Sequence, residues 1–196
     1  MSEADTTKII SQAKEVLSNN AHSGHTIPAE GIYPHQWLWD SCFIAIGLAH
    51  YDIARAQQEL RSLTKGQWHN GMIPHMVFDP GVFYRQDRQI WRSRTTQESP
   101  DNLATSGITQ PPVLAEAVVR IGKHLPKHER QLWYKEMYKP IVRYHSWLYR
   151  ERDPHKTGLV VNFHPWETGM DDSPPWIFAI DKLQQPLWIK LVRVLK

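Results

Sequence analysis

The chain is best interpreted from one stretch of thirteen residues: His164-Pro165-Trp166-Glu167-Thr168-Gly169-Met170-Asp171-Asp172-Ser173-Pro174-Pro175-Trp176. It holds three carboxylates, two tryptophans and one glycine. An indole ring stacks on the apolar face of a sugar, and a carboxyl group that such rings shield from water can donate a proton near neutral pH. Gly169 suits a backbone position with positive φ, which would aim Asp171 into a cavity. The pattern favours a carbohydrate site, and the alternative is an acidic turn that caps a following helix at Asp172 or Ser173.

The composition is that of one ordinary globular domain. The chain has 196 residues, of which 41% are hydrophobic and 22% are charged, enough for a full core and too apolar for a disordered protein. Nine tryptophans and eleven histidines are many for this length, and such side chains suit ligand-lined surfaces better than dry cores. The single cysteine, Cys42, excludes an internal disulfide and is expected to fill space in an apolar run.

Several classes of partner are not expected. The polar start, residues 1–5, does not resemble a signal peptide, and no apolar run approaches the roughly 20 residues that a membrane helix needs. We therefore expect a cytoplasmic protein with no membrane partner. The net charge of +3 is mild, and the densest basic run, Arg85 to Arg94, is interrupted by Asp87 and contains one aromatic residue, Trp91. This run fits a solvated loop, or a loop that receives a small anion, better than a nucleic-acid groove.

Helical periodicity dominates the apolar pattern. Asp52 and Gly66 are expected to cap and to stop one helix, and Pro140 to kink another. Two long irregular segments, residues 67–80 and 81–107, suggest functional loops. Helices alternate with aromatic-rich loops, which predicts an all-α fold of helical hairpins set around an axis, with long irregular loops converging on one end. The expected helices are residues 6–18, 41–50, 52–64, 111–124 and 127–150, one from Ser173, and a last apolar run at 186–195.

An ordered set of motifs resembles a known family. The set as a whole, between Tyr33 and Trp176, resembles glycoside hydrolase family 63 and its trehalase-like relatives, most of all the mannosylglycerate hydrolases. The resemblance implies an (α/α)6 toroid of six helical hairpins, inverting hydrolysis at one end of it, and no metal or other cofactor in the chemistry. The motifs are Tyr33-Pro34-His35-Gln36-Trp37-Leu38-Trp39-Asp40, Asn70-Gly71-Met72-Ile73-Pro74-His75, Gln110-Pro111-Pro112 and Trp166-Glu167-Thr168-Gly169-Met170-Asp171-Asp172-Ser173-Pro174.

The resemblance also implies roles for individual residues. Asp171 matches the general acid that protonates the glycosidic oxygen. The implied substrate-binding set is Tyr33, Trp37, Trp39, Asp40, His75, Tyr84, Gln110, Trp166, Glu167 and Gly169. Two of its carboxylates have alternatives. Asp40 could also cap a helix, and Glu167 could compete with Asp171 as the acid or hydrogen-bond either sugar hydroxyls or backbone. Trp37 and Trp39 would share one face of an extended segment, which favours a stacking platform. No closely spaced His or Cys pair supports a metal site.

The sequence departs from the family pattern in three places and lacks one essential group. Thr168 stands where Ser is usual, Asp172 stands where Asn is common, and residues 85–87 differ from the expected lid. An inverting glycosidase needs a second carboxylate about 6.5–9.5 Å from the acid, and nothing after Ser173 matches it. We therefore expect residues 1–196 to be the N-terminal half of the catalytic toroid. Its uncovered apolar faces would be met by a C-terminal half or by self-association.

Three functions remain open on the sequence. The first is hydrolysis of a small α-linked glycoside such as mannosylglycerate or glucosylglycerate, with Arg85, Arg88 or Arg94 pairing with a glycerate carboxylate. Its close variant is a trehalase or glucosidase that acts on trehalose or a short α-glucoside. The second is a sugar-binding fragment without catalysis, because the base is missing. The third, nucleic-acid binding, predicts steeply salt-dependent affinity for oligonucleotides, and we expect none.

Overall fold

A computed structural model of the chain describes residues 3–22, 24–82, 90–170, 174, 176 and 177, and every structural statement below concerns these. Two predicted site residues, Asp171 and Tyr84, lie outside the described residues, as does most of the helical sequence expected after residue 173. The expected all-α class is confirmed. The α-helices are α1 (Glu3–Asn19), α2 (Leu38–Leu48), α3 (Ile53–Lys65), α5 (Leu114–Lys123) and α6 (Lys127–Glu151).

Short strands and 3-10 turns lie in the segments outside these helices. Strand β1 (Ala21–His22) pairs antiparallel with β2 (His25–Thr26), and β3 (Gln36–Trp37) pairs antiparallel with β4 (Met76–Val77). Two 3-10 turns, η1 (Ser93–Thr95) and η2 (Pro165–Thr168), lie in the long loops. The β3–β4 pair matters most, because β3 leads directly into α2 and so fixes where that helix begins.

The helix boundaries follow the sequence signals where those signals are local. The Asp52 carboxylate accepts a hydrogen bond from the Arg55 backbone N–H at 3.0 Å, and Gly66 ends α3, as expected. The start of α2 differs. Its N-cap residue is Trp37, in extended conformation, and no side chain caps the helix. Asp40 lies in the first turn instead, so the alternative in which Asp40 caps α2 is wrong. A carboxylate there still interacts favourably with the helix dipole.

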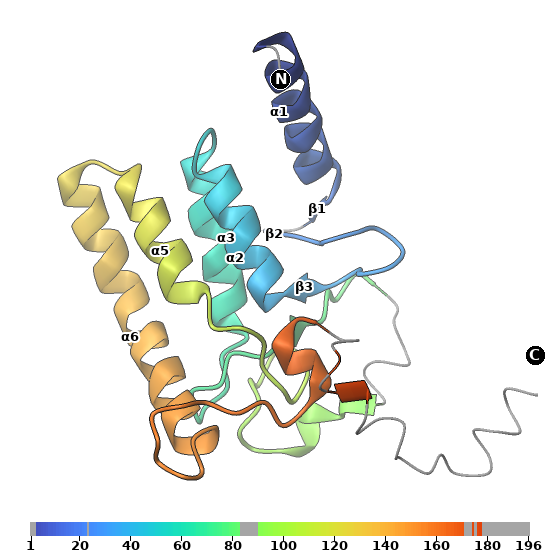
Figure 1. Ribbon diagram of the computed structural model, residues 1–196, viewed down its shortest axis with the longest axis vertical. Coiled ribbons are helices and arrows are strands. Elements are labelled where there is room, and N and C mark those ends of the chain that lie inside the picture. Colours follow the sequence, from blue (N-terminus) through green and yellow to red (C-terminus); the bar gives the residue numbers. More distant parts are fainter. Residues whose placement is uncertain (1–2, 23, 83–89, 171–173, 175, 178–196) are drawn as a thin grey trace, which may run out of the picture.

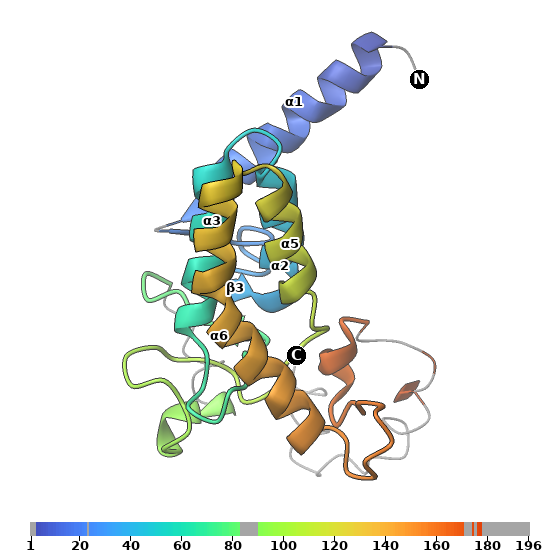
Figure 2. The same ribbon diagram turned by 90° about the vertical axis from the view of Figure 1, so that its left-hand side faces the viewer.

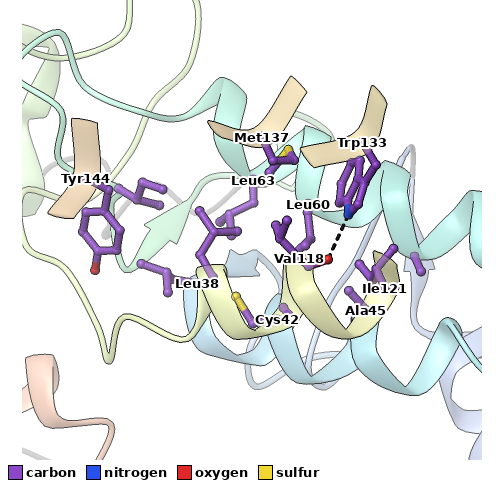
Figure 3. Close-up of a cluster of buried hydrophobic side chains, with 14 of the residues drawn as sticks. Leu38, Cys42, Ala45, Leu60, Leu63, Val118, Ile121, Trp133, Met137 and Tyr144 are labelled. Carbon is purple, nitrogen blue, oxygen red and sulfur yellow. Dashed lines mark hydrogen bonds between the residues drawn. The ribbon is translucent and has the colours of Figure 1, made fainter. Parts of the chain in front are cut away.

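Two helical hairpins form the core. Helix α2 packs against α3, α5 packs against α6, and α2 and α5 join the two hairpins. Figure 3 shows the side chains that meet between them, including Leu38, Leu60, Val118 and Trp133, whose indole N–H donates to the Val118 carbonyl at 3.0 Å. Each large apolar side chain that is fully buried contributes about 1.5–3 kcal/mol. The hairpins are therefore a rigid platform for the loops.

The loops gather at one end of this platform, as the sequence predicted. Figure 1 shows the segment after α3 and the segment after α6 at the lower end of the helices, next to β3. Helix α1 extends away from the opposite end, and Figure 2 shows it separated from the hairpins along most of its length. Its apolar side chains Ile9, Ile10 and Val16 are 50–55% exposed. No helix among the described residues is long and apolar enough to cross a membrane.

Candidate active site

The loop end contains an open cavity of about 400 Å³. Its size lies at the lower end of the range for small-molecule sites, about 300–1,000 Å³. Eight of the eleven predicted site residues line it, although they come from four separate parts of the chain. These eight are Tyr33, Trp37, Trp39, Asp40, His75, Gln110, Trp166 and Gly169. Of the other three, Asp171 and Tyr84 lie outside the described residues, and Glu167 is placed elsewhere.

Aromatic rings form most of the cavity wall. The Trp37 ring lies edge-to-face with Tyr33 at 5.4 Å and with His75 at 4.9 Å between centroids. Trp166 belongs to η2 and is 43% exposed, so one indole is open to a ligand. Trp39 also lines the cavity. It lies in the first turn of α2 whereas Trp37 ends β3, so the two do not share an extended segment. The β3–α2 junction brings both rings to the cavity.

Trp91 also lines the cavity, and the sequence analysis missed it as a site residue. Its ring centroid lies 5.4 Å from that of His75 and 6.0 Å from that of Trp166. It therefore closes the wall between these two rings. The available signal was a lone tryptophan at the end of a long loop in a chain whose other loops carry aromatic motifs. In the sequence it stands out only as the aromatic residue of a basic run.

Two polar residues of the cavity are hydrogen-bonded to the backbone at the start of α2. The side-chain oxygen of Gln110 accepts a hydrogen bond from the Trp39 backbone N–H at 3.3 Å, which turns its amide NH₂ away from α2. The His75 carbonyl accepts from the Leu38 backbone N–H at 3.0 Å. Both contacts join the start of α2 to loops that are distant in the sequence. The Gln110 side chain and the backbone of His75 are therefore tied to the start of α2 before any ligand arrives.

Burial changes the protonation of two groups in the cavity. Loss of water around the Asp40 carboxyl raises its pKa above the usual value, and hydrogen bonds partly oppose this rise. Loss of water around the His75 ring lowers its pKa to about 3, with a smaller effect from the nearby His164. His75 is therefore neutral at any physiological pH. A neutral imidazole among indoles suits an uncharged, hydroxyl-bearing part of a ligand.

Glu167 does not reach the cavity. Its side chain is 1% exposed and forms an ion pair with Arg152 at 2.8 Å. The same carboxylate accepts from the backbone N–H groups of Phe163 at 2.8 Å and Thr109 at 3.4 Å. The Arg152 guanidinium also lies over the Trp147 ring, 4.5 Å from its centroid. Of the alternatives for this carboxylate, the structure shows backbone and arginine contacts. They tie η2 to the end of α6.

Gly169 has the positive φ that the sequence suggested. Its φ is 70°, in the left-handed region. A Cβ atom at this position would lie 2.6 Å from Cη2 of Trp39, closer than real contacts allow. The backbone of the motif therefore rests directly on a cavity-lining indole. Asp171 follows two residues later.

The described residues contain no cluster of three or more His, Cys, Asp or Glu side chains suited to hold a metal ion. Away from the cavity, His22 and His25 both contact one Asp79 oxygen, at 3.1 and 3.3 Å. Cys42 is fully buried in the core, and burial raises the pKa of its thiol well above the usual range. It therefore fills space, as expected.

Comparison with known proteins identifies the family. Residues 33–188 match the model of the mannosylglycerate hydrolase MGH1-like glycoside hydrolase domain. Mannosylglycerate hydrolase MGH1 of Selaginella moellendorffii is 42% identical over 172 residues, which are 87% of this chain and 34% of that protein. The mannosylglycerate hydrolase of Thermus thermophilus is 46% identical over 168 residues, which are 84% of this chain and 40% of the relative.

A solved structure extends the likeness to the fold. A GH63 mannosylglycerate hydrolase from Thermus thermophilus, in complex with Tris and D-glycerate, matches with a TM-score of 0.79 and 40% identity. The match covers 90% of this chain and 42% of that one. The helical hairpins are thus a portion of a toroidal helical fold, as predicted, and the chain spans well under half the length of these relatives. The chain belongs to the mannosylglycerate hydrolase MGH1-like glycoside hydrolases of family 63.

Proposed function

We propose that this chain forms part of an inverting hydrolase of mannosylglycerate or a similar small α-linked glycoside. The observation that carries the proposal is the convergence of eight predicted sugar-site residues on one indole-walled cavity. The family supplies the reaction class, because the relatives that match are named mannosylglycerate hydrolases. A hexose presents apolar C–H faces to indoles and hydroxyls to polar side chains. The cavity offers both kinds of contact.

In the proposed reaction Asp171 is the general acid. The Asp171 proton passes to the glycosidic oxygen as the bond from that oxygen to the anomeric carbon breaks and glycerate leaves. Water attacks the opposite face of the anomeric carbon and gives its proton to a second carboxylate, about 6.5–9.5 Å from the acid. The position of Gly169 on the cavity wall supports this role, because Asp171 is only two residues away.

The sugar would be held by contacts of three kinds. Trp37, Trp39 and Trp166 would stack on its apolar faces, and Tyr33 would close one edge. Asp40 would accept from a hydroxyl, while Gln110 would donate to one through its free NH₂ group. The glycerate carboxylate would pair with an arginine of the loop before η1 or of η1 itself. Among those arginines Arg94 is described and exposed, while Arg85 and Arg88 lie outside the described residues.

The second carboxylate is proposed to come from the remainder of the toroid. The chain spans 34% and 40% of the two mannosylglycerate hydrolases compared. Apolar side chains on the outer face of α6 are 43–69% exposed, Leu132, Tyr138 and Val142 among them. Large apolar side chains exposed along one helix suggest an interface. We propose that a C-terminal half covers it, and the alternative occupant is a second copy of this chain.

A second candidate is a sugar-binding chain without catalysis, because Asp40 is the one carboxylate among the described residues that line the cavity. The test is to assay the chain alone, and then mixed with the part of the Thermus thermophilus relative that lies beyond the match. We expect D-mannose binding without turnover in the first case and release of mannose from mannosylglycerate in the second. Asp171→Asn should abolish that turnover and leave sugar binding intact, whereas the matched control Asp172→Asn should retain turnover.

Each contrary result has a distinct meaning. Near-normal turnover of Asp171→Asn would contradict the acid assignment. Faster cleavage of trehalose than of mannosylglycerate would favour the trehalase-type alternative. Binding without turnover in every mixture would favour the non-catalytic interpretation. A dimer of this chain that persists when the complementing segment is added would favour self-association over a C-terminal half.

A further inference from the structure

His75 is fully buried at the back of the cavity, and Ser106 lies directly behind its ring. The Ser106 hydroxyl oxygen is 2.5 Å from Nδ1 of His75. Ser106 is fully buried, does not line the cavity, and belongs to none of the four motifs. It can therefore influence a ligand in the cavity only indirectly.

The hydrogen bonds around Ser106 determine which way its proton points. The Met76 backbone N–H donates to the Ser106 oxygen at 3.1 Å, so this contact uses a lone pair and leaves the hydroxyl proton free. Two carbonyls, of Met76 and Ile108, lie at 3.5 Å, the limit of hydrogen bonding. Each already accepts a backbone N–H, at 3.0 and 2.7 Å. The near and unoccupied acceptor is Nδ1 of His75.

We propose that Ser106 is a positioning residue that donates to Nδ1 of His75, holds the ring proton on Nε2, and so makes Nε2–H a hydrogen-bond donor to a sugar hydroxyl. A neutral imidazole carries one proton, so an accepting Nδ1 requires a protonated Nε2. The assignment of the ligand rests on the proposed function. The assignment of the proton rests on the hydrogen bonds alone.

The surroundings of Nε2 are consistent with a hydrogen-bond donor whose acceptor would be a ligand. This nitrogen is buried and has no hydrogen-bond partner among the described residues. The rings nearest to His75 are the cavity indoles Trp37 and Trp91, with centroids 4.9 and 5.4 Å away. Burial lowers the pKa of His75 to about 3, so the donor stays neutral across the working pH range. An unpaired buried donor is unfavourable, and a ligand oxygen would satisfy it.

The first measurement is the tautomer of His75 in the chain as it exists. Long-range ¹H–¹⁵N correlation spectra of histidine-labelled protein distinguish a protonated ring nitrogen from an unprotonated one, and His75→Gln assigns the signal. We expect protonated Nε2 in the wild type and in Ser106→Thr, which keeps the hydroxyl. Ser106→Ala should shift the population toward protonated Nδ1. Ser99→Ala, which removes another buried loop serine hydroxyl, should leave the signal unchanged.

The second measurement is D-mannose affinity, followed by tryptophan fluorescence. Ser106→Ala should weaken binding about threefold to tenfold, the worth of one hydrogen bond, and Ser106→Thr should restore it. Protonated Nδ1 in the wild type, or a Ser106→Ala variant with wild-type tautomer and affinity, would overturn the role of Ser106. A wild-type chain with protonated Nε2 that does not bind mannose would overturn the proposed function and leave the proton assignment standing.

Discussion

Replacement of Glu167 by alanine should destabilise the chain more than loss of any surface carboxylate. The Glu167–Arg152 pair is buried, with side-chain exposures of 1% and 13%. Breaking a buried pair costs about 3–5 kcal/mol because it leaves an uncompensated charge. The backbone N–H groups of Phe163 and Thr109 would lose their acceptor as well. We therefore expect a loss of about 3–5 kcal/mol in the free energy of unfolding.

The chain supplies a matched control for this prediction. Arg61 and Glu136 form a slightly shorter pair, at 2.6 Å, with side-chain exposures of 38% and 43%. Solvent screens such a pair, so Glu136→Ala should cost about 1 kcal/mol or less. The two salt bridges differ in burial, and Glu167 also accepts from two backbone N–H groups. A comparison of the two alanine variants measures these two differences together.

Urea unfolding monitored by circular dichroism would measure both variants. A cycle with Glu167→Gln, Arg152→Met and the double variant would give the coupling energy, expected to be about 1–3 kcal/mol. Because Glu167 ties η2 to α6, Glu167→Ala should also weaken D-mannose binding through Trp166. A cost for Glu167→Ala no larger than that for Glu136→Ala would refute the reasoning.

Four further predictions follow from the cavity. Gly169→Ala should cost about 1–3 kcal/mol in stability, measured by urea unfolding, because φ is 70° and the new Cβ would meet Trp39. Trp91→Ala should weaken D-mannose binding about twofold to tenfold in a fluorescence titration. The free energy of unfolding should fall as pH falls from about 6.5 to about 3, by up to about 1.4 kcal/mol per pH unit. In this range His75 is protonated in the unfolded chain and neutral in the folded one, so His75→Gln should flatten the slope. Asp40→Asn should raise the melting temperature and weaken mannose binding, because burial disfavours the Asp40 charge.

The sequence predicted those parts of the fold whose causes are local. The cap at Asp52 and the stop at Gly66 each depend on residues within one turn, and both are present. The start of α2 was misplaced because its cause is not local. Pairing of β3 with β4 fixes the chain up to Trp37, and the Leu38 backbone N–H donates to the His75 carbonyl. The helix therefore begins at Leu38, without a capping side chain.

The site was predictable as a set of motifs and less so residue by residue. Eight residues meet at one cavity because each motif lies at the end of the helical hairpins where the loops gather. Glu167 was assigned to the substrate because its motif resembled a sugar site, whereas its burial depends on Arg152 at the end of α6. Trp91 was not predicted because it lies in a basic run of the sequence, and only the fold brings its ring to the cavity. Partners that meet only on folding leave no local pattern.

The contact between Gly169 and the Trp39 indole also bears on how the cavity assembles. The two residues lie near opposite ends of the cavity-forming sequence, so their contact closes a very long chain loop, and such closure is slow compared with hairpin formation. The helices should therefore regain their far-ultraviolet dichroism early in refolding, while competence to bind sugar returns later. Recovery of a refolded preparation should therefore be judged by sugar binding and not by its helical spectrum alone.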